Sequence, residues 1–288
     1  MAISLYSYWE VQSLGNNNNS GVFDPNTTMS ATLSSANGTS TLPTVTASNY
    51  SFVSSDVGNW LYVKSGTSWY PGWYLISSIA GTSAIVNATK FQAVNANLQE
   101  AFRDGIGSAA SLSSGTWTID YSQKASASKN YSDIALLTTT SLTSAGNTFY
   151  PSMIGNSIRI MSGSGFTAGL YVISSMIGNT ATIDRAAGTQ GSTGGTGLLG
   201  GALADLQTAL IGSTAISDKT TIYVKADDTY NWNSDTFIPG SGCYQNIVGY
   251  GTYRYDQSRV TVSIGASSTF IKNASFMKIF NFVFDGGG

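Results

Sequence analysis

The chain has 288 residues, of which 42% are hydrophobic and only 10% are charged, and its formal net charge at pH 7 is −2. Its 16 Tyr, 12 Phe and 6 Trp exclude a disordered chain, and its scattered Lys and Arg exclude a basic stripe for nucleic acid. Cys243 is the only cysteine, which excludes a disulfide framework, and no apolar run approaches the ~20 residues of a membrane span.

The first predicted elements belong to an internal repeat, which appears when the sequence is compared with itself at an offset of 97 residues. Residues 57–87 and 154–184 align without gaps, and 11 of the 31 positions are identical, which indicates a duplication. The matched turn and core positions are Gly58 and Gly155, Gly66 and Gly163, Gly72 and Gly169, Tyr74 and Tyr171, and Gly81 and Gly178.

Each copy of the repeat has the pattern of a small β-meander. Runs of β-branched and aromatic residues, such as 60–63 and 73–76, are bounded by turns that contain Gly66 and Gly81. Glycine favours such turns because it reaches positive φ without steric cost. Core and turn roles are therefore the leading interpretation of the matched residues.

A segment after each copy breaks the strand pattern, because apolar residues in 91–106 and in 198–211 recur at helical spacing. These residues are Val94, Leu98, Ala101, Phe102 and Ile106 in the first segment, and Leu199, Leu203, Leu206 and Leu210 in the second. The spacing predicts a short helix in each segment. Glycine-rich residues 188–201 have the composition of a connector before the second helix.

Beyond the connector, short apolar strands recur with glycine-rich turns between them, which suits the rungs of a β-solenoid. The predicted strands are 221–224, 246–248, 260–264, 269–271 and 277–284. We expect them to stack in parallel and to share one apolar column. The expected column consists of Ile222, Val224, Ile247, Val262 and Ile264.

Further motifs are spread along nearly the whole chain. They are Trp9-Glu10-Val11 followed by residues 16–21, Asp120-Tyr121-Ser122-Gln123, residues 191–203, residues 221–225, Gly249-Tyr250-Gly251-Thr252-Tyr253-Arg254, and Phe284-Asp285-Gly286. Together with the paired meanders, these motifs resemble the N-terminal region of large tailed-bacteriophage virion proteins with a parallel β-helix. Tail spikes, tail fibres and head or neck appendages are the types that the resemblance includes.

The resemblance implies a mainly β fold: two repeated small β-meander domains with short helices, followed by the start of a right-handed parallel β-helix. The expected domains are 1–107 with the first meander, 108–212 with the second, and 213–288 with the first rungs, which would continue further. The implied function is a structural virion protein, assembled in the host cytoplasm, that anchors or adapts an appendage for host attachment.

The expected partners follow from the same resemblance. They are other tail, neck or capsid proteins, identical subunits in a homotrimer and, through a C-terminal part, a host surface glycan. Nucleic acid and membrane insertion are not expected. Two alternative functions are the non-catalytic head part of a polysaccharide-degrading tail spike and a bacterial surface adhesin, although residues 1–8 lack the pattern of a signal peptide.

The residues predict no catalytic, cofactor or metal site. The absence of histidine removes Ser-His-Asp and Cys-His systems and the commonest metal ligand. A carboxylate pair, as in glycan hydrolysis, is the remaining route to catalysis. Its candidates are Asp227, Asp228, Asp235, Asp256 and Asp285. Because adjacent Asp227 and Asp228 would point to opposite faces of a strand, they make a poor pair, and we expect no enzymatic activity.

Trp69, Tyr70 and Trp73 distinguish the first copy of the repeat from the second, which has smaller residues at the same places. Large aromatic side chains serve in sugar stacking and in protein interfaces as well as in cores. We therefore treat these three residues as candidates for glycan or partner contact, with core packing as the competing interpretation.

Overall fold

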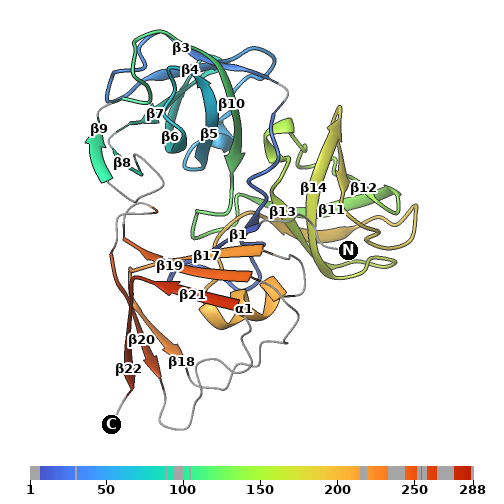
Figure 1. The fold of residues 1–288 in the computed structure, drawn as a ribbon. Helices are drawn as coiled ribbons and strands as arrows, with labels where there is room; N and C mark the ends of the chain where they lie inside the picture. The colour runs from blue at the N-terminus through green and yellow to red at the C-terminus, as the bar shows by residue number, and fades with distance from the viewer. Residues whose placement is uncertain are drawn as a thin grey trace.

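The computed structural model describes residues 7–29, 31–88, 90–93, 100–103, 105–214, 219–232, 244–251, 254, 258–264 and 276–286. Within these residues the protein is mainly β, as predicted, with two closed six-stranded barrels, a five-stranded sheet, a three-stranded sheet and a two-stranded hairpin. Figure 1 shows both barrels on the β1 side of the two larger sheets.

The first barrel has the strand order β10-β3-β4-β7-β6-β5. Its strands are β3 (Leu33–Ser35), β4 (Thr44–Ala47), β5 (Trp60–Thr67), β6 (Gly72–Ala80), β7 (Ser83–Asn87) and β10 (Leu112–Asp120), and the short 3-10 helix η1 (Ser54–Asp56) precedes β5. Alternate residues of β5 point inward, so that Leu61 and Val63 are fully buried and Tyr62 between them is partly exposed.

The second barrel has the order β11-β12-β15-β14-β13-β16. Its strands are β11 (Lys129–Thr138), β12 (Ser141–Thr143), β13 (Ser157–Ser162), β14 (Gly169–Ile177), β15 (Thr180–Ile183) and β16 (Gly195–Leu199), with the 3-10 helix η2 (Pro151–Met153) before β13. With β11 placed on β3 and β16 on β10, this order equals that of the first barrel. The two copies of the repeat therefore share one strand order, as the duplication implies.

The structure corrects the expectation that each copy is a separate meander. The aligned repeat supplies three consecutive strands, β5 to β7 or β13 to β15, and each barrel is closed by strands from outside it. A three-stranded sheet cannot cover its own apolar face, so closure with neighbouring strands buries that face and removes the free edges.

Matched residues occupy the same local structure in both barrels. Gly58 and Gly155 have φ angles of +81° and +86°, and each N–H donates to a carbonyl, that of Ile76 or Ile173, at 2.8 Å. Gly66 and Gly163, and Gly81 and Gly178, likewise share positive φ values. The turn role predicted for these glycines fits their observed backbone.

The two matched tyrosines also make equivalent hydrogen bonds. Tyr74 donates its hydroxyl to the carbonyl of Tyr70 at 2.7 Å, and Tyr171 donates to the carbonyl of Thr167 at 2.8 Å. Both rings are buried in the barrel cores. Gly72 and Gly169 open the second strand of each meander, opposite Val63 and Ile160.

The helix predicted for 91–106 is wrong in the described part of that segment. Strands β8 (Lys90–Ala93) and β9 (Glu100–Arg103) pair antiparallel, with Phe91 opposite Phe102. Lys90-Phe91-Gln92-Ala93 alternates polar and apolar residues, which also fits a strand, and its pairing with β9 prevails over the helical spacing. Val94 and Leu98 lie outside the described residues.

The second predicted helix is shorter than expected. Helix α1 (Leu206–Thr214) contains Leu206 and Leu210, whereas Leu199 belongs to β16 and Leu203 forms a bridge with Val11. Two features explain why the helix begins at Leu206 and not at residue 198. Gly200 and Gly201 have φ angles of +70° and +80°, which no helix contains, and the Asp205 carboxylate accepts a hydrogen bond from the Thr208 N–H at 2.6 Å as an N-cap.

The C-terminal part contains two sheets between which the chain alternates. The first has the order β2-β1-β17-β19-β21, and the second has the order β18-β20-β22. Their strands are β1 (Ser7–Val11), β2 (Val22–Phe23), β17 (Lys219–Lys225), β18 (Thr229–Trp232), β19 (Tyr244–Tyr250), β20 (Val260–Ile264), β21 (Phe276–Phe280) and β22 (Phe282–Gly286). All described strand pairs of these two sheets except β1 with β2 are parallel, so the predicted parallel pairing is confirmed for the described strands.

Three details of this part differ from the prediction or extend it. The predicted strand 277–284 is two strands, because Asn281 takes a φ of +60° and turns the chain from β21 into β22. Strand β18 was not predicted. The predicted strand 269–271 lies outside the described residues.

The predicted apolar residues lie in one cluster between the two sheets. Ile222, Val224, Ile247 and Val262 are fully buried there, and Ile264 packs against them partly buried. The cluster also contains Trp9 of β1 and Leu210 of α1, so the helix and the first strand cover one end of the stack.

Strand β1, which precedes both barrels in the chain, belongs to the first of the two C-terminal sheets. It pairs in parallel with β17, with Ser7 opposite Thr220. Both barrels are thus inserted between two neighbouring strands of one sheet (Figure 1). The first barrel extends past residue 107 to Asp120, and the second ends with Leu199.

Candidate functional site

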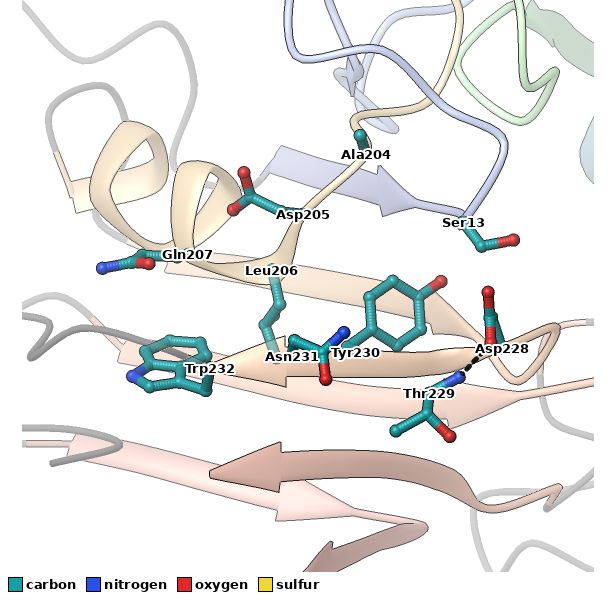
Figure 2. Close-up of a pocket in the computed structure, with 10 residues that line it drawn as sticks. All are labelled: Ser13, Ala204, Asp205, Leu206, Gln207, Asp228, Thr229, Tyr230, Asn231 and Trp232. Atoms are coloured by element: carbon teal, nitrogen blue, oxygen red, sulfur yellow. Dashed lines mark hydrogen bonds between the residues drawn. The ribbon is translucent and has the colours of Figure 1, made fainter. Parts of the chain in front are cut away.

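A pocket of about 380 Å³ lies between the start of α1 and strand β18 (Figure 2). It is lined by Ser13, by residues 204–207 and by residues 228–232. Strand β18 is the first strand in the described order of its sheet, and all four of its residues line the pocket. Tyr230 and Trp232 are buried beneath it, whereas Thr229 and Asn231 on the opposite face of the strand are exposed.

The lining of the pocket is acidic. The Asp205 carboxylate is fixed at the start of α1, where it accepts hydrogen bonds from Thr208 and, at 2.6 Å, from the Asn17 amide. The Asp228 carboxylate accepts a hydrogen bond from the Thr229 N–H at 2.7 Å. Among the described residues that line the pocket there is no lysine or arginine, so this part of the lining favours a neutral or basic ligand.

Tyr230, in the floor of the pocket, makes hydrogen bonds to the turn before β18. Its hydroxyl lies 2.9 Å from the Lys225 carbonyl and 3.1 Å from Asp227 Oδ1. Burial, aided by the nearby Asp227 carboxylate, raises the pKa of Tyr230, so the hydroxyl remains a neutral donor. The same Asp227 oxygen accepts the Ser13 N–H at 3.1 Å.

The candidate carboxylates take different places. Asp227 holds the turn described above, Asp228 lines the pocket, and Asp285 is exposed on β22. Asp235 and Asp256 lie outside the described residues. In the part of the chain that the structure describes, no group of three His, Cys, Asp or Glu residues could hold a metal ion. No described helix is long and apolar enough to span a membrane.

A second polar cluster joins the first barrel to the parallel sheets. Arg254 Nη2 lies 2.8 Å from Glu10 Oε2 of β1, and Arg254 Nη1 lies 3.2 Å from Asp120 Oδ2 at the end of β10. The exposed fractions of the three side chains are 2%, 0% and 0%. We call Glu10, Asp120 and Arg254 the junction cluster.

Further donors complete the junction cluster. Tyr250 and Gln12 donate to Glu10 Oε1, and Trp73 donates to Asp120. Burial raises the pKa of Glu10, although the Arg254 guanidinium opposes this shift. Burial also raises the pKa of Tyr250 well above its usual range. Such dense hydrogen bonding is what buried charge requires.

Aromatic rings enclose the Arg254 guanidinium, whose central carbon lies 4.1 Å from the ring centre of Tyr223, 5.0 Å from that of Trp73 and 5.8 Å from that of Tyr8. Trp73 also stacks on Tyr62 with ring centres 4.2 Å apart. The rings favour the cation through their quadrupoles. Trp73, predicted as a contact residue, thus lies in an internal junction.

Trp69 and Tyr70 lie within the first barrel. Trp69 is 6% exposed, and its indole donates to the Ser113 carbonyl at 3.0 Å. The half-buried Tyr70 donates its backbone N–H to Ile106 at 2.9 Å. These contacts give both residues a role in the barrel, and their contact with a glycan or partner stays a prediction.

A hydroxyl and carboxylate cluster joins the two barrels. Tyr50 and Tyr121 donate their hydroxyls to the two oxygens of Asp56 at 2.6 and 2.7 Å. Both hydroxyls also lie within 2.9 Å of Ser152 Oγ in the second barrel. Burial, with the Asp56 charge as the next cause, raises the pKa of both tyrosines.

Sequence reasoning did not identify the junction cluster or the pocket. Glu10, Asp120 and Arg254 each occur in a motif that carried the resemblance, but the motifs gave no contact between them. A usable signal is the placement of a charged residue between large apolar ones, as in Trp9-Glu10-Val11, in a chain with only 10% charged residues.

Comparison with known proteins adds no identification. The chain matches no family model, and no curated protein is significantly similar to it.

Proposed function

We propose that this chain is the anchoring or adaptor part of a structural virion protein of a tailed phage, as in a tail spike, tail fibre or head or neck fibre. The observation that carries the proposal is the insertion of two duplicated barrels between neighbouring strands β1 and β17. This topology gives the barrels a fixed place at one end of the parallel sheets, as an anchor at the base of a projecting shaft requires.

The parallel sheets support the second half of the proposal, in which they are the first rungs of a right-handed parallel β-helix. The chain alternates between the sheets, and each strand pairs in parallel with one of the next turn. Exposure along the apolar columns rises at the last turn, to 36% at Ile279 and 42% at Phe284. Further rungs would cover these side chains.

In this proposal the barrels bind the rest of the particle, and this role requires no catalytic activity. Tail, neck or capsid proteins are the partners, and host attachment follows from the shaft. We expect residues 1–288 to release no reducing sugar from capsule or lipopolysaccharide. Turnover that disappears in Asp227→Asn or Asp285→Asn would favour a polysaccharide-degrading spike instead.

The assembled particle provides the decisive test. Mass spectrometry of purified virions should detect the chain in a stoichiometric amount, and antibodies against the barrels should label one fixed position on the particle. Light scattering of the whole protein should give a homotrimer, because a low-charge appendage without disulfides gains stability by burying surface between identical chains. Absence from the virion, or surface exposure on bacteria without phage, would contradict the proposal.

A further inference from the structure

The connector between β2 and the first barrel contains Asp24-Pro25, the only aspartate in the chain that is followed by proline. A peptide bond from aspartate to proline is labile in acid, because the aspartyl carboxyl group can attack its own carbonyl carbon and the proline nitrogen is a good leaving group. In an unfolded chain the reaction is slow, since the reacting groups are seldom aligned.

The two ends of the connector are fixed on different barrels. The Asp24 N–H donates to the carbonyl of Gly155, just before β13 of the second barrel, at 2.7 Å. The Met29 N–H donates to the carbonyl of Trp117 in β10 of the first barrel at 2.8 Å. Residues between these two points are therefore held in one conformation, and Asp24 is buried there.

Hydrogen bonds arrange the Asp24 side chain and carbonyl group. The Asn26 N–H donates to Asp24 Oδ1 at 2.8 Å, and the ring that this bond closes contains the peptide bond from Asp24 to Pro25. The Thr27 hydroxyl donates to the Asp24 carbonyl oxygen at 2.9 Å, and the Thr27 N–H approaches the same oxygen at 3.4 Å. Two donors on one carbonyl oxygen stabilise the negative charge that an attack on its carbon creates.

We propose that the folded chain cleaves itself between Asp24 and Pro25 in acid, with the Asp24 carboxyl group as nucleophile and Thr27 as donor to the carbonyl oxygen. A carboxyl oxygen of Asp24 forms a bond to its own carbonyl carbon. The bond from that carbon to the Pro25 nitrogen breaks, and the carboxyl proton passes to the nitrogen. Water then opens the cyclic anhydride left on Asp24, and it has access because Asn26 beside the bond is exposed.

Lys64 of β5 is the charged group that the described contacts place beside this site. Its ammonium group donates to the Thr27 carbonyl and, at 2.9 Å, to the Thr28 hydroxyl. Burial lowers the pKa of Lys64 to about 8, and the Asp24 carboxylate opposes this shift. Lys64 therefore stays a cation in acid, where it fixes the connector and attracts the ionised form of the Asp24 carboxyl group.

Cleavage changes how the first barrel is attached. Residues 24–28 lead into the barrel, and residues 121–128 lead out of it to the second barrel. After the cut, β1 keeps its pairing with β17, and the barrel remains joined to the rest through 121–128 alone. This activity goes beyond the proposed anchoring function and does not rest on it, so the two proposals can fail separately.

The intact protein tests the proposal with and without concentrated urea. The pH is the lowest at which circular dichroism still shows the native β signal, near the ordinary aspartate pKa of about 4. Mass spectrometry should detect fragments 1–24 and 25–288, and the folded chain should form them at least about tenfold faster than the chain in urea, because the fold aligns the reacting groups. Equal or slower cleavage of the folded chain would mean ordinary acid lability and would overturn the proposal.

Variants identify the reacting groups. Asp24→Asn keeps an acceptor for the Asn26 N–H but removes the nucleophile, and it should abolish cleavage. Thr27→Val should slow cleavage roughly tenfold to hundredfold, as the loss of an oxyanion donor does. Thr28→Val is the matched control and should leave the rate unchanged, because the Thr28 hydroxyl contacts Lys64. Cleavage that persists in Asp24→Asn, or equal rates in the two valine variants, would overturn the assigned chemistry.

The role of Lys64 shows in the pH profile of cleavage. Lys64→Met should move the profile to higher pH, because the Asp24 carboxyl group then takes up its proton without a neighbouring cation. A purely structural role of Lys64 would change the rate at every pH and leave the profile in place, and that result would contradict the role assigned to its charge.

Discussion

Arg254 and its two carboxylate partners are almost completely removed from water. Two charged pairs in such a place gain Coulomb energy but lose hydration, so the intact cluster is a weak argument for net stability. Removal of one member of the cluster does lower stability, because the remaining charges stay buried without a partner. The junction cluster therefore fixes how Glu10 of β1 and Asp120 of the first barrel meet.

Replacement of the arginine tests this role. Arg254→Met should lower the free energy of unfolding by about 3–5 kcal/mol, because both carboxylates stay buried without their cation. Lys225→Met is the matched control, since Lys225 lies 3.9 Å from Asp227 with 35% of its side chain exposed. It should change stability by less than about 1 kcal/mol. Urea unfolding followed by tryptophan fluorescence measures both, and equal losses would contradict the assignment.

The buried tyrosines make stability depend on alkaline pH. Burial raises the pKa of Tyr50, Tyr121, Tyr131 and Tyr250 in the folded chain. Unfolded tyrosine ionises near pH 10. A group whose pKa is raised by folding contributes stability that is full below the unfolded pKa and is lost as pH rises. The free energy of unfolding should therefore fall above about pH 10.

Tyrosinate absorbance and circular dichroism check this expectation together. The buried tyrosines should ionise only as the β signal is lost, whereas the chain in urea should titrate near its ordinary pKa. Reversible ionisation of all tyrosines around pH 10 with the fold intact would contradict their burial.

At the ends of the barrel strands, two kinds of turn glycine are required for different reasons. Gly178 has a φ of +56°, and a Cβ there would meet nothing within 4 Å. Gly163 has a φ of +142°, and a Cβ there would lie 2.6 Å from Phe166 Cδ2 and 2.8 Å from Gly195 Cα. The first glycine serves the turn alone, whereas the second also admits an aromatic ring.

Alanine substitution should separate these reasons. Gly178→Ala should cost about 1–2 kcal/mol for the left-handed backbone. Gly163→Ala should cost a further 1–3 kcal/mol or so, because the ring and the facing strand must move. Thermal or urea unfolding measures the difference. Gly81→Ala and Gly66→Ala should give the same ranking in the first barrel, and a reversed ranking there would contradict the equivalence of the barrels.

At the scale of the whole molecule, the two ends of the described stack of parallel strands differ in exposure. Ile222, Ile247 and Ile279 occupy one column, with exposed fractions of 0%, 0% and 36%. Helix α1 and Trp9 cover the buried end. An isoleucine in this column is therefore fully buried in β17 and β19 but partly exposed to solvent in β21, the last described strand of the sheet.

This gradient predicts unequal effects of the same substitution. Ile247→Ala should cost about 2–5 kcal/mol as a buried cavity, and Ile279→Ala less than about 1 kcal/mol, since its surroundings can relax into solvent. Urea unfolding at low protein concentration measures both. Equal losses that grow with protein concentration would mean that another chain covers the exposed end.

The sequence by itself determined the local features of this protein. The run of β-branched and aromatic residues 60–63, bounded by glycine turns, predicted a strand, matched glycines such as Gly58 and Gly155 predicted turns, and the offset of 97 residues revealed the duplication. These features depend on backbone sterics and on neighbours a few residues away, so a local pattern encodes them. The parallel stacking from about residue 221 followed from the same kind of recurrence.

Only the tertiary structure decided which segments meet. Closure of each barrel needs strands outside the repeat, and β1 pairs with β17 through contacts such as Ser7 with Thr220. The junction cluster and the pocket beside β18 arise from these long-range pairings, so no spacing in the sequence indicates them. Segment 91–106 shows the same limit, because its apolar residues recur at helical spacing, yet the pairing between β8 and β9 decided for strands.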